Sequence, residues 1–461
     1  MAHVVAVSNG IKHWWVHFTR HYPARTAIGV FAVSALFITF LLSLPISTSG
    51  RVGAGLSTAL FTAVSAICIT GLTVVDTATF WSPFGHVVIM VAIAIGGLGI
   101  MTAAAIMGLA VSRHLGLAQR MLMASETKTQ RLGDVRRLIK VIIVTALTCE
   151  LAVALLLFPR FVYLDRNPVR AAWHSLFYGI SAFNNAGFVL TPGGLSQYVG
   201  DWLICLPLML GVFVGSLGFP VIMNLRATQK HHLRFWRNWS LHSKLTIVGS
   251  LALVAFGFIA FFALEYNDPN TLGPLSFPTK ILASLFASVM PRSGGFATLP
   301  PGGYIPAMRL ITIALMFIGG GAAGTAGGIK VTTLMVLLLA IRAEARGDRD
   351  VEAFGRRIPY GAVRVAIAVL VGGLAIVLAA TVLLLWLTNT TLDLALFEVL
   401  SAFSTSGLEG GLSAHLNLPG RLLIILLMFI GRAGPMTFAA ALAFRDQQRV
   451  IRYPEERPII G

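Results

Sequence analysis

Four short turns that end in glycine carry the residues with the clearest chemical use. Their glycines are spaced at intervals of 116, 108 and 112 residues, and no turn contains an acidic residue. Glycine lets backbone carbonyls approach a ligand closely, and rings of carbonyl oxygens can replace the water around a monovalent cation. Calcium and magnesium instead favour carboxylate oxygens. The turns therefore predict a backbone site for a monovalent cation, with the ion-binding residues Ile69, Thr70, Gly71, Asn185, Ala186, Gly187, Ser293, Gly294, Gly295, Thr405, Ser406 and Gly407.

A second set of small residues lies 24 to 28 residues after the turn glycines. They are Gly96-Gly97, Gly215-Ser216, Gly319-Gly320 and Gly431, which Arg432 follows. Small residues let helices approach closely or unwind, whereas a charged side chain near the centre of a bilayer is expensive and normally faces a polar cavity. Arg432 is therefore predicted to oppose cation passage or to hold a neighbouring loop. The alternative is a structural arginine that caps carbonyls and has no gating role.

The third of these positions opens a segment, residues 319–328, that holds six glycines in ten residues. A continuous helix is heavily disfavoured there, because each glycine costs about 1 kcal/mol relative to alanine. We predict an unwound intramembrane loop below the four turns that acts as a gate. Its residues are Gly319, Gly320, Gly321, Gly324, Thr325, Gly327 and Gly328, with Lys330 and Arg432 beside it. A phosphate-binding loop is the alternative, but no strand precedes the segment and the Walker spacing fails at Lys330.

The elements that must position these residues belong to a membrane protein. The chain has 461 residues, of which 56% are apolar and only 11% charged, and its mean hydropathy is +0.81. A soluble protein carries about 25% charged residues. Apolar segments follow one another four times in the order long, short, long, within residues 27–112, 141–225, 245–341 and 365–446. The long segments can cross a bilayer and the short ones cannot.

These patterns predict an all-α integral membrane fold of four tandem pore repeats. It has eight transmembrane helices and four re-entrant pore helices around one central pore, because irregular backbone survives at membrane depth only where protein buries it or water lines it. Four unrelated interfacial helices are the alternative. The net charge of +17 is concentrated in short segments between the repeats and at both ends. By the positive-inside rule these segments are cytoplasmic, including the N-terminus at 1–26 and the C-terminal tail at 447–461.

Several stretches of the sequence resemble the Trk/Ktr/HKT superfamily of potassium transporters. The strongest are Ser65–Ile67 with Thr70–Asp76, Ile95–Thr102, Ser181–Phe188, Gly327–Val331 and Gly431–Pro435, and Arg452-Tyr453-Pro454-Glu455 is similar to the Ktr branch. The resemblance implies four M1-P-M2 units (helix, pore helix, helix) around one pore that conducts K⁺ in the cell membrane. It also implies a homodimer in membrane lipid, seated on a cytoplasmic nucleotide-binding regulatory ring that contacts the basic cytoplasmic face. The chain itself would need no cofactor, and Na⁺ is a candidate activator.

Two departures and three alternatives qualify this resemblance. The third turn reads Ser293-Gly294-Gly295 where the family leads us to expect Thr-Ala-Gly, and Pro291 precedes Arg292 in place of a small residue, so this turn is expected to be less rigid. In the plant branch a serine at the first filter glycine accompanies sodium preference, so Gly71 favours potassium.

An ion-coupled carrier of another cation such as Na⁺ would use inverted repeats. A membrane enzyme would need a reactive cluster, and a nucleic-acid partner would need a folded basic domain.

Overall fold

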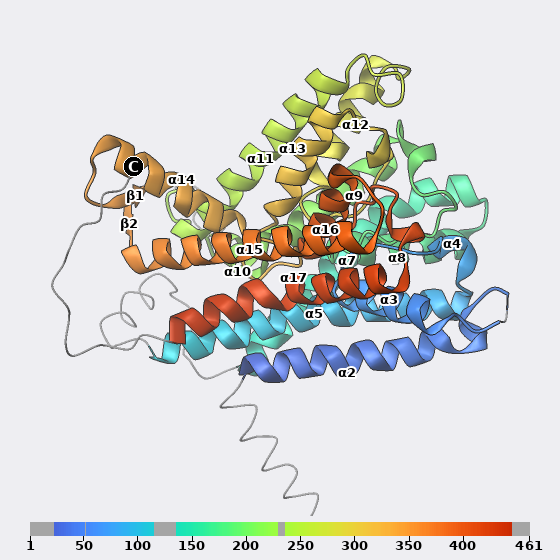
Figure 1. The fold of residues 1–461 in the computed structure, drawn as a ribbon, viewed down its shortest axis with the longest axis horizontal. Helices are drawn as coiled ribbons and strands as arrows, with labels where there is room; N and C mark the ends of the chain where they lie inside the picture. The colour runs from blue at the N-terminus through green and yellow to red at the C-terminus, as the bar shows by residue number, and fades with distance from the viewer. Residues whose placement is uncertain (1–22, 51, 115–134, 229–235, 445–461) are drawn as a thin grey trace, which may run out of the picture.

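The computed structural model describes residues 23–50, 52–114, 135–228 and 236–444, and these are mainly helical (Figure 1). Along the chain the helices form four sets, each with a long helix, a helix of 12 to 16 residues and a further segment of one or two helices. The first set is α2 (Pro23–Ser43), α3 (Leu56–Ile67) and α5 (Pro83–His114), with the short α4 (Thr77–Phe80) before α5. The second is α7 (Val135–Asp165), α8 (Pro168–Phe183), α9 (Trp202–Leu217) and α10 (Phe219–Thr228). The predicted tail at 447–461 and most of the predicted N-terminal segment lie outside the described residues.

The third and fourth sets follow the same order. The third is α11 (Leu241–Glu265), α12 (Phe277–Val289), α13 (Pro306–Phe317) and α14 (Val331–Arg346), and the fourth is α15 (Tyr360–Leu387), α16 (Leu392–Phe403) and α17 (Leu418–Phe444). Single 3₁₀ turns are η1 (Pro45–Ser47), η2 (Ser196–Tyr198), η4 (Pro301–Gly303) and η5 (Ser413–His415).

A small β-hairpin between the third and fourth sets departs from the all-α prediction. Strands β1 (Val351–Ala353) and β2 (Arg356–Ile358) pair antiparallel, with Val351 opposite Ile358. The two-residue turn between them has φ +53° at Phe354 and +73° at Gly355, as a type I′ hairpin turn requires. Strands of three residues are too short to produce a readable alternation of apolar and polar residues, so the pattern did not predict them.

The long helices have the dimensions and the surface of membrane spans. Within the described residues, Ile139–Asp165, Leu241–Glu265 and Tyr360–Leu387 are each long and apolar enough to cross a membrane, and the bent pair α9–α10 adds a fourth candidate. Helices α2, α5 and α17 have 21, 32 and 27 residues, or at least about 31 Å at 1.5 Å per residue. Large apolar side chains are exposed on the long helices: Phe37 of α2 is 60% exposed and Trp386 of α15 is 81% exposed. The chain is a multi-pass membrane protein.

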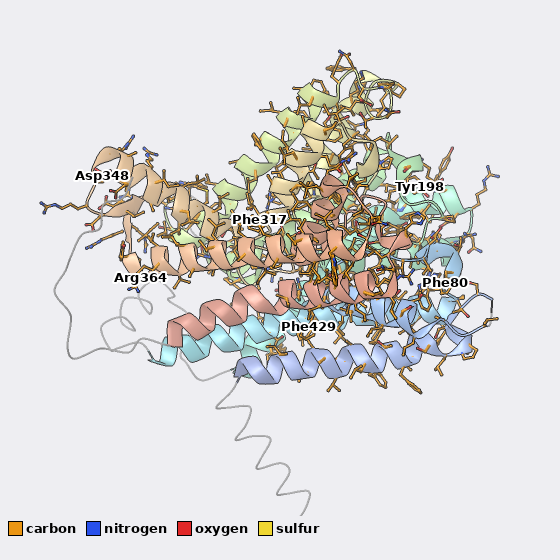
Figure 2. All side chains as sticks on the ribbon, viewed as in Figure 1. Phe80, Tyr198, Phe317, Asp348, Arg364 and Phe429 are labelled. Atoms are coloured by element: carbon orange, nitrogen blue, oxygen red, sulfur yellow. The ribbon has the colours of Figure 1, made fainter. Side chains whose placement is uncertain are left out.

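Four of the long helices define the long axis of the molecule (Figure 1). Helices α2, α5, α17 and α15 run side by side along its longest axis, and each contacts the next (Figure 1). Figure 2 places Asp348 and Arg364 at one end of this axis, Phe80 and Tyr198 at the other, and Phe317 between them. The interruption of the third unit begins after Phe317, and residues 319–321 and 324–329 within it are buried.

Two of the long segments are broken. Helix α13 ends at Phe317 and α14 begins at Val331, so that residues 318–330 lie outside regular helix. This segment contains the predicted loop 319–328 and keeps the name intramembrane loop from that prediction. The second break lies in the predicted repeat 141–225, where α9 and α10 meet at 93°. Gly218 has φ +88° at the bend, and Pro220 follows in the first turn of α10, where its missing N–H does no harm. The Gly218-Phe219-Pro220 sequence was the available signal for this break.

The four short helices lie in the core. Each contains a phenylalanine that is less than 2% exposed: Phe61, Phe177, Phe286 and Phe397. Their last turns are almost entirely buried as well. Since the long helices surround them, the chain that follows each short helix is delivered to the interior of the protein.

Candidate ion-conduction site

The four predicted turns share one backbone conformation. The first residue of each turn has a positive φ, with values of +54° at Ile69, +59° at Asn185, +68° at Ser293 and +48° at Thr405. The glycine two residues later also has a positive φ, with values of +90° at Gly71, +70° at Gly187, +72° at Gly295 and +81° at Gly407. A β-branched residue rarely adopts such a φ, and this kind of strain is concentrated at functional sites.

Three of the turns are closed by the same pair of hydrogen bonds. After α3, the Thr70 amide donates to the Ser65 carbonyl at 2.8 Å and the Ile69 amide donates to the Ala66 carbonyl at 3.2 Å. These two bonds form a Schellman motif. The same bonds recur after α8, from Ala186 and Asn185 to Ser181 and Ala182, and after α16, from Ser406 and Thr405 to Ser401 and Ala402. The recurring serine of the short helices therefore supplies a carbonyl that closes each of these three turns.

The third turn closes differently, in line with its unusual sequence. Its serine precedes the turn glycine by one residue more than in the other units, and Gly294 donates to the Met290 carbonyl, four residues back, at 2.8 Å. The fourth turn supports it, because Ser293 Oγ donates to the Thr405 carbonyl at 2.7 Å and Ser406 Oγ donates to the Pro291 carbonyl at 3.0 Å. The expected looseness of this turn is offset by bonds from its neighbour.

Arg292 anchors the third turn on its outer side. It is only 2% exposed, and its guanidinium donates to the Ser250 carbonyl at 2.8 Å and to Ser250 Oγ at 3.0 Å. Its side chain therefore reaches from the turn to α11 and fixes one to the other.

The structure brings all four turns together. A Cβ atom added to Gly71 would overlap the carbonyl oxygen of Ala186, and one on Gly407 would overlap that of Thr70. A Cβ on Gly187 would lie 2.6 Å from Gly295 Cα, and one on Gly295 would lie 3.1 Å from the Ser406 carbonyl oxygen. The first turn thus touches the second and fourth, and the third touches the same two. The twelve predicted ion-binding residues form one closed ring of backbone.

The small residues of the second long helices allow this ring to form. A Cβ on Gly96, Gly215 or Gly431 would overlap the carbonyl oxygen of the last residue of the preceding short helix, which is Ile67, Phe183 and Phe403 in turn. Each glycine therefore lets its long helix pass directly against the end of its own short helix. In the third unit, a Cβ on Gly319 would instead overlap the Gly327 carbonyl, within the intramembrane loop.

Backbone hydrogen bonds close the intramembrane loop and hold it against the α9–α10 bend. Its two ends are joined where Gly319 donates to the Ile329 carbonyl at 2.8 Å and Ile329 donates to the Phe317 carbonyl at 3.2 Å. Gly321 donates to the carbonyl of Ser216, beside the α9–α10 bend, at 2.7 Å. The bend that sequence analysis missed is therefore the support against which the loop rests.

Both cationic residues predicted for the gate bind loop carbonyls. Arg432 is 5% exposed and its guanidinium donates to the Thr325 carbonyl, while Lys330 Nζ donates to the Ala326 carbonyl at 2.6 Å. Thr325 Oγ1 in turn donates to Asn185 Oδ1 in the second turn at 3.1 Å. Arg432 and Lys330 thus hold consecutive carbonyls of a loop that lies directly against the ring.

A contact beyond the ring was not predicted. Glu409, two residues after the fourth turn glycine, accepts hydrogen bonds from the Thr73 amide at 2.7 Å and from Thr73 Oγ1 at 2.8 Å. It ties the first turn to the fourth across 336 residues of sequence. Only the folded structure brings these two residues together.

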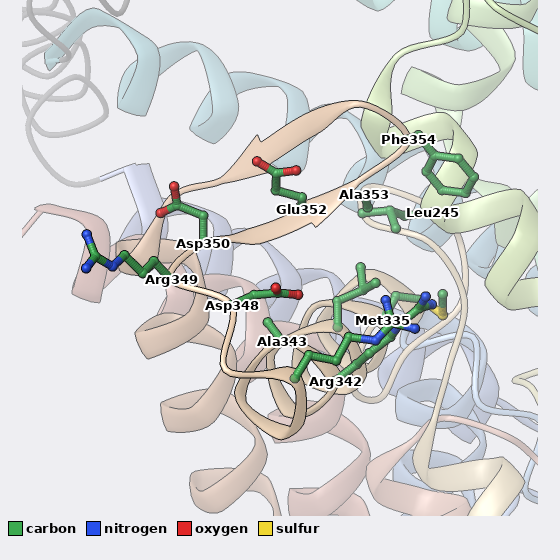
Figure 3. Close-up of a pocket in the computed structure, with 12 residues that line it drawn as sticks. Leu245, Met335, Arg342, Ala343, Asp348, Arg349, Asp350, Glu352, Ala353 and Phe354 are labelled. Atoms are coloured by element: carbon green, nitrogen blue, oxygen red, sulfur yellow. The ribbon is translucent and has the colours of Figure 1, made fainter.

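A separate cavity of about 700 Å³ lies at the far end of α14 (Figure 3). Helices α11 and α14 and the β-hairpin surround it, and its wall includes Met335, Arg342, Asp348 and Phe354. None of the ring or loop residues lines it. Figure 2 shows Asp348 at the end of the molecule opposite Tyr198 and Phe80.

Known proteins match almost the whole chain. A model of the TrkH family, described as a cation transport protein, matches residues 3–453. The Ktr system potassium uptake protein B of Bacillus subtilis is 40% identical over 447 residues, covering 97% of this chain and 98% of that protein. Its counterpart in Vibrio alginolyticus is 36% identical, covering 94% and 93%. The crystal structure of the potassium transporter TrkH from Vibrio parahaemolyticus shares the fold, with a TM-score of 0.65 and 17% identity over 88% of this chain and 83% of that one.

Proposed function

Because the chain belongs to the TrkH family of cation transport proteins, we propose that it takes up potassium ions across the cell membrane through a channel-like pore. The four turns are its selectivity filter and K⁺ is the ion they select. The relatives named potassium uptake proteins support the choice of ion. The supporting observation from the structure is the closed ring, in which four turns with one φ pattern meet at their glycines.

The chemistry of the ring suits a dehydrated monovalent cation. Its atoms nearest the neighbouring turns are backbone atoms, among them the carbonyl oxygens of Thr70, Ala186 and Ser406. Carbonyl oxygens carry partial charge and replace water without binding a small cation irreversibly. No carboxylate belongs to the twelve residues, so the ring lacks the ligands that a divalent ion prefers. An ion can therefore enter and leave.

The intramembrane loop with Arg432 and Lys330 is the proposed gate. The loop lies against the second, third and fourth turns, and the two cations would repel an arriving K⁺ and hold the loop closed by hydrogen bonds. A buried hydrogen bond to a charged group contributes about 1.5–3 kcal/mol, so Arg432 alone can bias the loop strongly toward the closed state. Opening requires the loop carbonyls of Thr325 and Ala326 to leave these donors.

The end of the molecule that carries Asp348 and Arg364 is the proposed cytoplasmic face. The linker before α15 is rich in arginine, and the positive-inside rule puts such linkers in the cytoplasm. A nucleotide-binding regulatory ring would dock on this face of a homodimer in the lipid bilayer. The relatives are named as parts of a Ktr system, which supports the presence of further subunits. Sodium as an activator would appear as faster K⁺ uptake at constant driving force when Na⁺ is added.

Growth of potassium-uptake-deficient bacteria tests this function. The native chain, alone or with a regulatory ring subunit, should restore growth at micromolar to millimolar K⁺ and support ⁸⁶Rb⁺ uptake. Rescue only with the ring subunit would identify the chain as the membrane half of a two-part system. No rescue with either arrangement, despite normal membrane expression, would refute the assignment of potassium.

A further inference from the structure

One buried hydroxyl group joins the intramembrane loop to two turns of the ring. The amide of Gly327, in the loop, donates to Ser293 Oγ at 3.1 Å, and the same oxygen donates to the Thr405 carbonyl at 2.7 Å. Ser293 is fully buried. Its hydroxyl proton is therefore committed to a carbonyl of the fourth turn, while one of its lone pairs is committed to the loop.

We propose that Ser293 is a positioning residue that couples ion selection in the ring to closure of the loop. This inference rests on the proposed function. A hydroxyl that accepts a hydrogen bond donates a stronger one, because hydrogen bonds in a chain polarise one another. With the loop in place, Ser293 holds the Thr405 carbonyl most firmly and lowers its capacity to bind a cation. When the loop leaves, this hold weakens and the carbonyl becomes available to the ion.

The packing around the hydroxyl makes the coupling direct. A Cβ on Gly327 would overlap Thr405 Oγ1 and would lie 2.7 Å from the Ser404 carbonyl oxygen, so the loop touches the fourth turn without an intervening side chain. Any displacement of Gly327 must therefore change the surroundings of Thr405. The third turn itself is closed by the bond from the Gly294 amide to the Met290 carbonyl, whereas the other three turns are closed by Schellman motifs.

The rest of the loop is held independently of Ser293. Backbone bonds join Gly319 to Ile329 and Gly321 to Ser216, and Thr325 Oγ1 binds the second turn. Removing one hydroxyl should consequently leave the loop and the ring assembled. It should change only the balance between the closed and open positions and the freedom of the Thr405 carbonyl.

The test compares Ser293→Ala with Ser293→Thr and with the matched control Ser288→Ala in the full-length chain. Ser288 is also fully buried, but its hydroxyl donates within α12 to the Leu285 carbonyl at 2.8 Å. Two quantities are measured on each variant in the uptake-deficient bacteria: the basal ⁸⁶Rb⁺ uptake without a regulatory subunit, and the ratio of the Na⁺ and K⁺ concentrations that halve this uptake.

Ser293→Ala leaves the buried amide of Gly327 without its acceptor and should raise basal uptake about fivefold or more. It should change the Na⁺/K⁺ ratio at the same time, and Ser293→Thr should restore both quantities while Ser288→Ala changes neither. A change in only one quantity, in neither, or equally in the Ser288 control would overturn the coupling. If Ser293→Ala fails to reach the membrane, Ser293→Cys, with its weak donor, must give the same paired change. Absence of uptake by the native chain both with and without a regulatory ring subunit would instead refute the proposed function.

Discussion

Replacement of Gly71 by serine is the most sensitive perturbation of the ring. Gly71 has φ +90°, and a Cβ there would lie well under 3.0 Å from the carbonyl oxygen of Ala186 in the neighbouring turn. Both atoms belong to rigid backbone, so Ala186 or Gly71 has to move by more than about 0.5 Å, which is the tolerance within which a binding site keeps its geometry. The substitution also strains the backbone by about 1–2 kcal/mol, because L-residues avoid positive φ.

This displacement falls on an atom that the proposed mechanism uses to distinguish ions. If the ring loses about 1.4 kcal/mol of its preference for K⁺ over Na⁺, the selectivity falls tenfold. We therefore expect Gly71→Ser to lower the Na⁺/K⁺ ratio of half-inhibiting concentrations for ⁸⁶Rb⁺ uptake by about that factor. The variant should still reach the membrane, because the strain is a small part of the total burial energy.

Gly411→Ser is the matched control. Gly411 has φ +93°, nearly that of Gly71, but no atom lies within 4 Å of a Cβ built there. It carries the same backbone strain without touching the ring and should keep the native selectivity. Unchanged selectivity in Gly71→Ser, or an equal loss in both variants, would refute the assignment of the four turns as the filter.

Further variants test the gate and the supports of the ring. Arg432→Ala should raise basal ⁸⁶Rb⁺ uptake about tenfold or more, because a buried charged hydrogen bond to the loop is lost. Deletion of 321–327 should also raise basal uptake. Unchanged uptake and regulation in either variant would rule out the gate. Gly431→Ala should lower the Tm of the purified protein, since its Cβ would overlap the last carbonyl of α16; an unchanged Tm would show that α17 has room there. Glu409→Ala should lower the Tm through loss of both bonds to Thr73, and Glu409→Gln, which keeps an acceptor oxygen, should recover part of it.

The residues of the ring could be predicted from the sequence because their constraint is local. A backbone that needs positive φ after a short helix selects glycine, and the chain repeats this requirement at Gly71, Gly187, Gly295 and Gly407. The interruption at 318–330 is equally local, since six glycines within ten residues weaken any helix. The length of the apolar segments predicted where the long helices run.

Contacts between units could not be predicted in the same way. In the sequence, Ser293 is only a minor departure from the family pattern. In the folded protein its hydroxyl donates a hydrogen bond to the carbonyl of Thr405, which is 112 residues away in the sequence. The pair of Thr73 and Glu409 has no signal in either local sequence. Gly218 and Pro220 were a signal for the bend between α9 and α10. The bend was not predicted because the apolar run continues through these residues.

The most direct test of the central claim is to locate the ion. A crystal of the full-length protein grown in Rb⁺ should give an anomalous peak inside the ring, surrounded by carbonyl oxygens from all four turns, and the peak should weaken when K⁺ is added. A peak coordinated by side chains elsewhere, or a ring without density in Rb⁺-saturated crystals, would contradict the account.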